Sequence, residues 1–401
     1  MKISKLALSL ADSPTLKLNA KANQLKAEGK AVIHLGGGEP ESPAPETAIK
    51  AGTEKLRGGK VKYTPVGGTA DMKKAVIAYT ERCYGKKVGP ENVLVSGGAK
   101  QALYNFFLSV IEPGDEIIYP APYWVSYPEM IKLCGGVPVA VAPRPGTFEA
   151  DLSAIEKAIT PKTQALILNS PNNPSGTVYP EEVVRGAVEL CERKGIYLVM
   201  DDIYHQLVFG GEKTSSCYKF GRNHDNIVVI NGVSKLYGMT GFRIGWAVAN
   251  KELIAVMNKM QGQTTSCPSD LSQAACAAAL NGPQDCVADL VKSLEHGRKL
   301  LLDGLKPLSK LKVSPPRGTF YCLADFSAYN KDSGALCQFL LEKALVVTVP
   351  GREFGMEGHL RISYCGKPED IAEGARRIVW ALEPSSPKEI TIGGQKYERN
   401  W

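Results

Sequence analysis

Apolar and polar positions alternate in blocks along most of the chain. Between about residues 45 and 285, short apolar runs rich in β-branched residues alternate with segments of helical spacing. Such an alternation indicates a mostly parallel sheet with helices on both faces. Each apolar run ends in polar or small residues, and we expect strands at 92–98, 116–122, 164–171, 196–202 and 226–234.

The rest of the pattern differs from this alternation. A short strand at 31–35 leads into the Gly- and Pro-rich stretch GGGEPESP, and after about residue 288 the pattern becomes α+β, with strand-like residues at 311–326, 345–355 and 361–365. Helices are expected at 16–30, 100–111, 181–195, 289–305 and 368–382.

A chain of 401 residues exceeds the usual size of one domain. The change of pattern predicts a large domain at 45–287 and a small α+β domain at 288–383, which the N-terminal segment 1–44 joins. The tail 384–401 is punctuated by Pro, Ser and Gly. It is expected to form a hairpin around Gly393 and Gly394 or an oligomer contact.

Composition narrows the class of protein. The chain has 44% hydrophobic and 22% charged residues, as globular proteins do, and no run of about 18 apolar residues predicts a membrane span. The net charge of +7 is spread out, and no basic block predicts nucleic-acid binding. The ten cysteines form no CxxC pair and the N-terminus has no signal-peptide pattern, which favours reduced thiols in a cytoplasmic protein. The five histidines lack metal-ligand spacing and are interpreted as structural.

Residues able to do chemistry follow several of the expected strands. In parallel sheets, ligands bind beyond the carboxyl ends of the strands. SGGAKQAL (96–103) reads as a strand, a Gly turn and a helix start, which is an anion-binding arrangement but not an ATP-type GxxxxGK[ST] loop. The other candidates at this edge are Trp124, Asn169–Gly176, Asp201–Tyr204 and Ser234–Lys235.

Five motifs in order carry a resemblance to class I aminotransferases. NSPNNPSG resembles the Asn-Asn-Pro-Thr-Gly loop of that family, and nearly the whole chain is similar to the bacterial aspartate and prephenate aminotransferases of fold type I. The motifs lie at 122–130, 169–176, 196–209, 234–246 and 361–364. The resemblance implies an α/β fold with a mostly parallel seven-stranded sheet sandwiched by helices and a smaller α+β domain. It also implies pyridoxal 5′-phosphate (PLP) as cofactor, amino acid and 2-oxo acid substrates, and a homodimer.

The resemblance implies four kinds of contact between the protein and the ring of the cofactor. Lys235 is expected to carry PLP covalently and to act as acid and base, and Asp201 to pair with the ring nitrogen. Asp202 competes for that role and is interpreted instead as a helix cap or surface residue. Tyr204 and Asn173 are expected at the ring oxygen O3′. Trp124 is expected to stack on the ring.

The phosphate is expected at the Gly turn and at an arginine. Where the family often has a phosphate-binding serine, three residues before the lysine, this chain has Gly232, and Ser234 is the alternative hydroxyl. Tyr63 matches a tyrosine that reaches the phosphate of a neighbouring subunit. The remaining expected phosphate contacts are Gly98, Ala99, Lys100 and Arg243.

Substrate recognition is expected to involve two carboxylates. Arg361 matches the arginine whose planar guanidinium binds the substrate α-carboxylate. Gly38, Trp124 and Asn173 are expected beside it. Thr15 and Lys100 match residues that contact a distal carboxylate, which favours a dicarboxylic substrate without separating aspartate or glutamate from prephenate. The family's usual aromatic residue after Glu-Pro-Asp is Ser42 here.

The activity that the resemblance implies is transamination of aspartate and 2-oxoglutarate by a ping-pong mechanism. Prephenate or aromatic amino acid transamination is an alternative, and a PLP-dependent carbon–sulfur β-lyase is a further one on the same fold. A transcription regulator with an aminotransferase-like module is disfavoured, because the family pattern starts by about residue 13.

Overall fold

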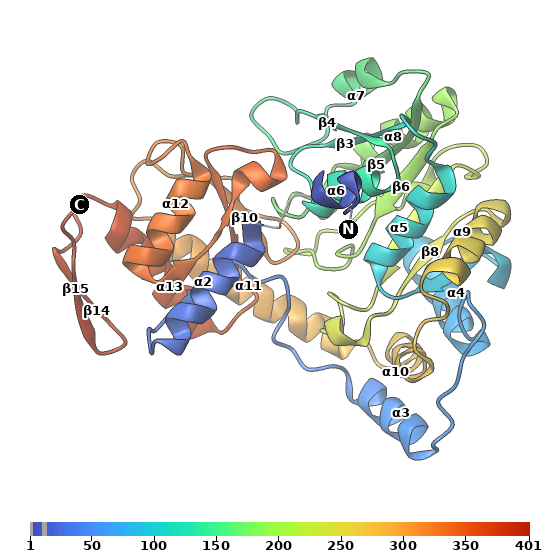
Figure 1. Cartoon of the computed structure of the whole chain (residues 1–401), viewed down its shortest axis with the longest axis horizontal. Coiled ribbons are helices and arrows are strands. Elements are labelled where there is room, and N and C mark those ends of the chain that lie inside the picture. Colours follow the sequence, from blue (N-terminus) through green and yellow to red (C-terminus); the bar gives the residue numbers. More distant parts are fainter. Residues whose placement is uncertain (1–2, 10–13) are drawn as a thin grey trace.

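The computed structural model describes residues 3–9 and 14–401, without the side chains of residues 6, 9 and 14–17. Its largest element is a seven-stranded sheet in the order β2-β8-β7-β6-β5-β3-β4 (Figure 1). The strands are β2 (Val93–Ser96), β3 (Glu116–Pro120), β4 (Val137–Val141), β5 (Thr163–Leu168), β6 (Tyr197–Asp201), β7 (Ile227–Gly232) and β8 (Gly245–Val248).

The sheet is mostly parallel, as the sequence predicts. Strand β8 is antiparallel to both of its neighbours, β2 and β7, and the other pairings are parallel. The edge strand β4 contains Pro138, which an edge strand tolerates because part of its backbone needs no ladder partner. The carboxyl ends of β2, β3, β5, β6 and β7 therefore share one edge.

Helices cover both faces of this sheet, which explains why its strands are almost continuously apolar. In β6, Leu198 and Met200 join the core on the side of α4 and α8, and Val199 joins the core on the side of α5 and α9. The helices up to residue 281 are α1 (Lys5–Ser9), α2 (Pro14–Ala27), α3 (Glu46–Arg57), α4 (Ala70–Tyr84), α5 (Ala99–Val110), α6 (Ser126–Leu133), α7 (Leu152–Ala158), α8 (Glu181–Lys194), α9 (Lys251–Thr264) and α10 (Asp270–Asn281).

The C-terminal part builds a four-stranded sheet in the order β12-β13-β10-β9. Strand β1 (Ile33–His34) pairs in parallel with β11 (Val346–Val347), so the N-terminal segment completes this part, where Figure 1 also shows α2. Its other elements are α11 (Asp285–Leu305), β9 (Lys312–Val313), β10 (Tyr321–Asp325), α12 (Ser333–Phe339), β12 (Val349–Pro350), β13 (His359–Ser363) and α13 (Pro368–Leu382).

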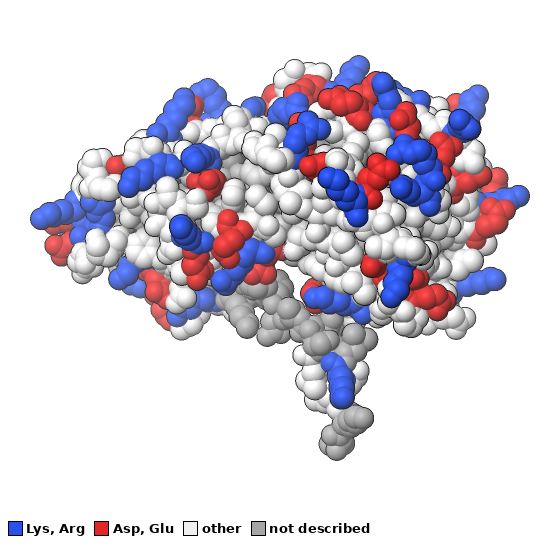
Figure 2. Space-filling view, turned by 90° about the horizontal axis from the view of Figure 1, so that it is seen from above, with Lys and Arg blue, Asp and Glu red and all other residues white. Residues whose placement is uncertain are grey.

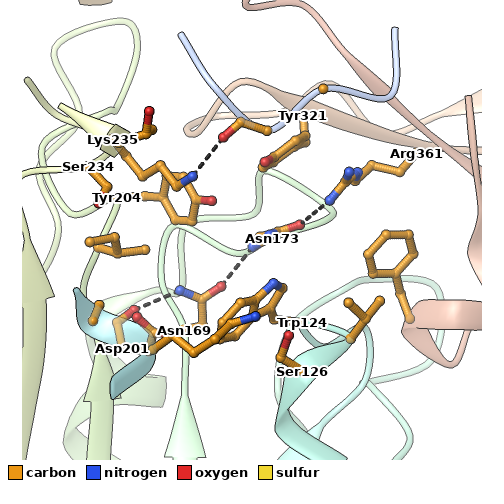
Figure 3. Close-up of a pocket in the computed structure, with 18 of the residues that line it drawn as sticks. Trp124, Ser126, Asn169, Asn173, Asp201, Tyr204, Ser234, Lys235, Tyr321 and Arg361 are labelled. Atoms are coloured by element: carbon orange, nitrogen blue, oxygen red, sulfur yellow. Dashed lines mark hydrogen bonds between the residues drawn. The ribbon is translucent and has the colours of Figure 1, made fainter. Parts of the chain in front are cut away.

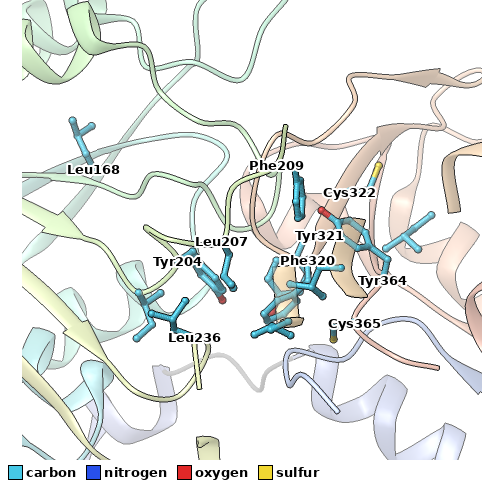
Figure 4. Close-up of a cluster of buried hydrophobic side chains, with 14 of the residues drawn as sticks. Leu168, Tyr204, Leu207, Phe209, Leu236, Phe320, Tyr321, Cys322, Tyr364 and Cys365 are labelled. Atoms are coloured by element: carbon cyan, nitrogen blue, oxygen red, sulfur yellow. The ribbon is translucent and has the colours of Figure 1, made fainter. Parts of the chain in front are cut away.

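A buried apolar cluster joins the two parts of the chain. Figure 4 shows Tyr204, Leu207 and Phe209, which follow β6, packed against Phe320 and Tyr364 from the C-terminal part. An isolated bridge between Val208 and Gly318 ties the same two segments by their backbones. The edge of the large sheet therefore lies against the C-terminal part.

The tail forms the expected hairpin from β14 (Glu389–Ile392) and β15 (Gln395–Glu398). Gly393 and Gly394 form its turn with φ of 56° and 79°, as a two-residue hairpin turn requires. Beyond it, the Trp401 ring packs on Trp380 at a centroid distance of 5.3 Å. The tail is thus folded onto the C-terminal part.

The surface carries charges of both signs. Figure 2 shows Lys and Arg interspersed with Asp and Glu over the face that it displays. Among the residues that the structure describes, no helix is long and apolar enough to cross a membrane.

Candidate active site

A cavity of about 440 Å³ lies at the carboxyl edge of the seven-stranded sheet, against the C-terminal part (Figure 3). Residues from five strand ends and from the N-terminal segment line it. The predicted site residues on its wall are Gly38, Ala99, Lys100, Trp124, Asn173, Asp201, Tyr204, Ser234, Lys235, Arg243 and Arg361.

Lys235 follows β7 and points into this cavity. Its Nζ donates a hydrogen bond of 2.7 Å to the carbonyl of Gly38. Burial lowers the pKa of Lys235 to about 8, an effect that the nearby Arg361 and Arg243 reinforce. Lys235 is therefore neutral far more often near neutral pH than an ordinary lysine, as a nucleophile or base requires.

Asp201 ends β6 with its two carboxylate oxygens in different surroundings. Oδ2 accepts a hydrogen bond of 2.6 Å from Tyr127, whereas the buried Oδ1 has no partner among the described residues. Burial raises the pKa of Asp201 to about 6, although the Tyr127 hydrogen bond and Lys235 oppose this shift. An unpaired carboxylate oxygen on the cavity wall needs a cationic donor.

Asp202 does not compete for this position. Asp202 is only 5% exposed, and no helix in the described part of the chain begins beside it, so the interpretation as a helix-cap or surface residue is wrong. Burial raises the pKa of Asp202 to about 7, and a hydrogen bond with Tyr84 opposes the shift. Successive side chains of an extended segment point to opposite faces, which directs Asp202 away from the cavity.

Two buried asparagines, Asn169 and Asn173, connect Asp201 with Arg361 (Figure 3). Asn169 donates to the Asp201 carbonyl at 2.7 Å and accepts from the Asn173 backbone at 2.8 Å. Arg361 donates to Asn173 Oδ1 at 3.1 Å and to the Gly36 carbonyl at 3.0 Å. Its guanidinium carbon lies 4.2 Å from the ring centroid of Tyr321, and its buried Nε has no partner in the described structure.

The anion-binding end is built by the turn before α5. Gly98 is the N-cap with φ of 97°, and no side chain caps this helix, so the first helical N–H groups point to the cavity end without an intrahelical acceptor. The N–H of Gly98 donates to the Ser96 carbonyl, so Gly98 does not offer this N–H to a phosphate as expected. The N–H groups of Ala99 and Lys100 remain for that role. Gly245 of β8 lets this turn come close, since a Cβ there would lie 2.3 Å from the Ala99 nitrogen.

Arg243 stands beside this turn. Its Nη1 donates to the Thr240 carbonyl at 2.9 Å, and a Cβ on Gly98 would lie 2.5 Å from its Nη2. Arg243 has a φ of 53°, a left-handed conformation that non-glycine residues adopt at a cost of about 1 kcal/mol or more. Strain of this kind persists where the surrounding structure fixes a functional side chain.

Little space surrounds Gly232, which stands where the family often has a serine. A Cβ on Gly232 would lie 3.0 Å from the Ile244 carbonyl and 3.1 Å from the Gly245 Cα. Both atoms belong to the backbone and leave little room for a serine. Ser234 lines the cavity instead.

Tyr63 and Gly98 do not line the cavity, and Thr15 cannot be assigned to it from the described side chains. Tyr63 is 93% exposed and lies away from the cavity wall of its own chain. Thr15 lies in the first turn of α2, and its side chain is outside the described residues.

The sequence interpretation missed several residues of the site. Tyr127 lies one helical turn after Trp124, a spacing that could have indicated it. Tyr321 comes from β10 and has no motif around it. His34, interpreted as structural, lines the cavity together with Asn19.

Comparison with known proteins agrees with this geometry. The model of the family "Aminotransferase class I and II" matches residues 30–378. The chain belongs to this family. An aspartate/prephenate aminotransferase of Nitrosomonas europaea is 38% identical over 400 residues, covering 95% of this aminotransferase and 100% of the relative. An aspartate aminotransferase of Rhizobium meliloti is 38% identical over 389 residues, covering 94% and 95%.

Solved structures show the same fold. The aminotransferase superposes on the aspartate aminotransferase of Rhizobium meliloti with a TM-score of 0.91 and 36% identity, covering 94% of this chain and 98% of that one. The Thermus thermophilus enzyme solved with maleate gives a TM-score of 0.89 and 38% identity, with the same coverage.

Enzymes of this family depend on PLP, and the cavity fits that cofactor. The unpaired Asp201 Oδ1 offers an acceptor to a protonated ring nitrogen. Lys235 offers an amine of lowered pKa. Ala99 and Lys100 offer helix N-terminal N–H groups beside Arg243, which suit a phosphate.

Proposed function

We propose that this PLP-dependent aminotransferase transfers the amino group of aspartate or glutamate to a 2-oxo acid. The observation that carries the proposal is a cavity with two separate cations, Arg361 and Lys100, in addition to Arg243 at the anion-binding turn. A dicarboxylic substrate presents two carboxylates, and each needs a cationic partner when it leaves water.

The positions of the site residues in the cavity support a set of contacts with the cofactor. Lys235 would carry PLP, Asp201 would pair with the ring nitrogen, and Trp124 would stack on the ring. Tyr204 and the free amide nitrogen of Asn173 donate to the ring oxygen. The backbone N–H groups of Ala99 and Lys100, together with Ser234 and Arg243, would hold the phosphate.

The chain's own residues then divide the chemistry. When bound, PLP draws electrons from the substrate Cα. Arg361 orients the substrate through its α-carboxylate, and Nζ of Lys235, once released from the cofactor by the substrate amine, removes the proton from Cα. Asn173 connects the two regions because its Oδ1 accepts from Arg361 while its amide nitrogen remains available.

The names of relatives support a dicarboxylic substrate. Those cited above are aspartate or aspartate/prephenate aminotransferases, and the Thermus thermophilus structure holds maleate, a dicarboxylate. Prephenate, which also carries two carboxylates, is the second candidate acceptor, and the Nitrosomonas europaea relative supports it by name.

A titration with single amino acids tests the proposal. The cofactor absorbance of the purified enzyme is followed while L-aspartate, L-glutamate, L-alanine or L-phenylalanine is added. We expect aspartate and glutamate to convert the cofactor at the lowest concentrations, without sustained release of ammonia and pyruvate. Conversion by alanine or phenylalanine alone would contradict the dicarboxylate proposal, and steady ammonia release would favour the β-lyase.

We also propose a cytoplasmic homodimer with the domain division 1–44, 45–287, 288–383 and 384–401. The exposed ring of Tyr63, at 93%, supports a contact with the site of a second copy. The ten cysteines are all free, which suits a reducing compartment. A dimer mass in solution and loss of phosphate affinity in Tyr63→Phe are the expected results, and a monomer with full activity would contradict the dimer.

A further inference from the structure

Two polar side chains line the cavity near Arg361 without a part in holding the cofactor. His34 is the last residue of β1, and Asn19 lies in α2, one helical turn after Thr15. His34 Nε2 and Asn19 Oδ1 are 2.7 Å apart. Because an amide oxygen only accepts, Nε2 carries the proton of this hydrogen bond.

The other ring nitrogen of His34 faces the glycine segment at the cavity wall. A Cβ on Gly37 would lie 3.9 Å from Nδ1, and one on Gly36 would lie 3.4 Å from Cε1. The Gly36 carbonyl accepts a hydrogen bond from Arg361. The imidazole therefore lies beside the segment that also holds the substrate-binding arginine.

The way an amino acid substrate fits the cavity indicates which residues its side chain contacts. Under the proposed function, the substrate Cα faces Lys235 and its α-carboxylate faces Arg361. The side chain is the remaining substituent and reaches the rest of the wall, which includes Lys100 as well as His34 and Asn19. His34 and Asn19 supply polar atoms there, with Nδ1 as an acceptor when the ring is neutral and as a donor when it is protonated.

We propose that His34 is a specificity-determining residue that binds the distal carboxylate of a dicarboxylic substrate through Nδ1 in its protonated form. This inference rests on the proposed function and names a substrate contact within that site. Asn19 fixes the ring and its tautomer through Nε2. Binding of a dicarboxylate then takes up one proton at Nδ1, and binding of a neutral amino acid takes up none.

The electrostatic surroundings fit such a proton-coupled contact. Burial lowers the pKa of His34, Lys26 of α2 and Arg361 of β13 lower it further, and a hydrogen bond with its own backbone opposes this shift. Asn19, Gly36, Gly37 and its ladder partner Val347 carry no charge. A distal carboxylate supplies the missing counter-charge and raises the pKa of the imidazole.

The test compares two substrates over a range of pH. The ratio of kcat/KM for L-aspartate to kcat/KM for L-alanine is measured from about pH 5.5 to 8.5, where histidine titrates. The titrations of Lys235 and Asp201 change kcat/KM for both substrates, so their effects cancel in the ratio. A carboxylate binds more tightly where His34 is protonated, so the wild-type ratio should rise as the pH falls.

Substitutions separate specificity from structure. In His34→Leu the ratio should be about tenfold lower at the acid end, because the variant lacks one hydrogen bond to a charged group. The ratio should also be independent of pH. Asn19→Ala keeps the ionisable ring and should keep the pH dependence, whereas a ring that only anchors α2 would lose function equally in both variants. His296→Leu, on the exposed side of α11, is the matched control and should leave the ratio unchanged.

Binding provides a readout without turnover. The pKa values of the five histidines are followed by NMR of the holoenzyme, with the His34→Leu spectrum used for assignment. Maleate should raise the pKa of His34, and acetate at equal concentration should not.

The outcomes distinguish the two proposals. If the wild-type enzyme showed no preference for aspartate over alanine at any pH, the proposed transamination of dicarboxylic substrates would be contradicted. If that preference exists but His34→Leu keeps it with the same pH dependence, or if maleate leaves the His34 pKa unchanged, the role of His34 is overturned and the function stands.

Discussion

The hydroxyl of Tyr127 donates a 2.6 Å hydrogen bond to Oδ2 of Asp201 and leaves the buried Oδ1 without a partner among the described residues. Burial alone would move Asp201 toward its protonated form, since its pKa is raised to about 6. A hydrogen bond to the ionised carboxylate opposes that change. Tyr127 is therefore a positioning residue that keeps Asp201 charged and correctly oriented near neutral pH.

Tyr127→Phe should lower kcat about tenfold, because a hydrogen bond to a charged group contributes about 1.5–3 kcal/mol. Loss of a donor to the ionised form raises the pKa of Asp201, so the acid limb of the kcat profile should move to higher pH. Steady-state kinetics across the acid range measures both effects. Tyr119→Phe is the control, because its ring lies 6.0 Å from that of Tyr127 and its hydroxyl has no bond to Asp201. Equal profiles for the two variants would contradict the role of Tyr127.

Cofactor attachment should depend on the protonation of Lys235. Only the neutral amine attacks a carbonyl, and the neutral fraction grows as the pH rises through the lowered pKa of about 8. The rate of covalent PLP uptake by the cofactor-free enzyme should therefore increase from neutral pH and level off above about 8, with stopped-flow absorbance as the measurement. A rate independent of pH in this range would be inconsistent with the buried amine. Lys235→Arg should bind PLP without covalent attachment.

Gly98→Ala should weaken PLP binding about tenfold or more, because the added Cβ would lie 2.5 Å from Arg243 Nη2 and displace the arginine from the turn. The control is Gly114→Ala, which has a similar φ of +93° but no atom within 4 Å of the added Cβ. Both variants carry backbone strain of about 1 kcal/mol, so their melting temperatures should fall alike. Equilibrium dialysis with PLP should distinguish them, and equal PLP affinity would argue against the proposed phosphate contact.

Arg361→Lys should lower kcat/KM for all amino acid substrates about 100-fold, because an ammonium cannot replace the planar fork that contacts Asn173 and the Gly36 carbonyl. The loss should appear mainly in KM, since Arg361 acts on the α-carboxylate and not on the reacting bond. Arg376→Lys, on the exposed face of α13 beside Glu373, is the matched control. An unchanged KM in Arg361→Lys would place the α-carboxylate elsewhere.

The sequence predicted the strands that are marked by apolar runs and missed those that are not. The run at 196–202 became β6 within a residue at each end, because burial on both faces requires continuous apolar residues. Strand β8 lies inside the lysine motif, and its antiparallel direction depends on where the chain returns to the sheet. Strand β4 has exposed positions and a proline, so it carries no strong signal.

The same distinction applies to the site. Residues that directly follow strands, such as Asp201 and Lys235, could be placed because parallel strands bring their ends to one edge. Tyr321 enters through the antiparallel pairing of β10 with β13, which no local pattern encodes. His34 occupies the end of a two-residue strand, where periodicity does not reveal which face borders a cavity.

The pairing of Ile33 with Val346 also sets an order of events during synthesis. All strands of the seven-stranded sheet precede residue 249, so a chain leaving the ribosome can complete that sheet while β11 and β13 are still unmade. Strand β1 has to wait for its partner, and Gly38 and Arg361 come together only at the end. A nascent chain therefore acquires Lys235 and Asp201 in place before it acquires the arginine that selects an amino acid.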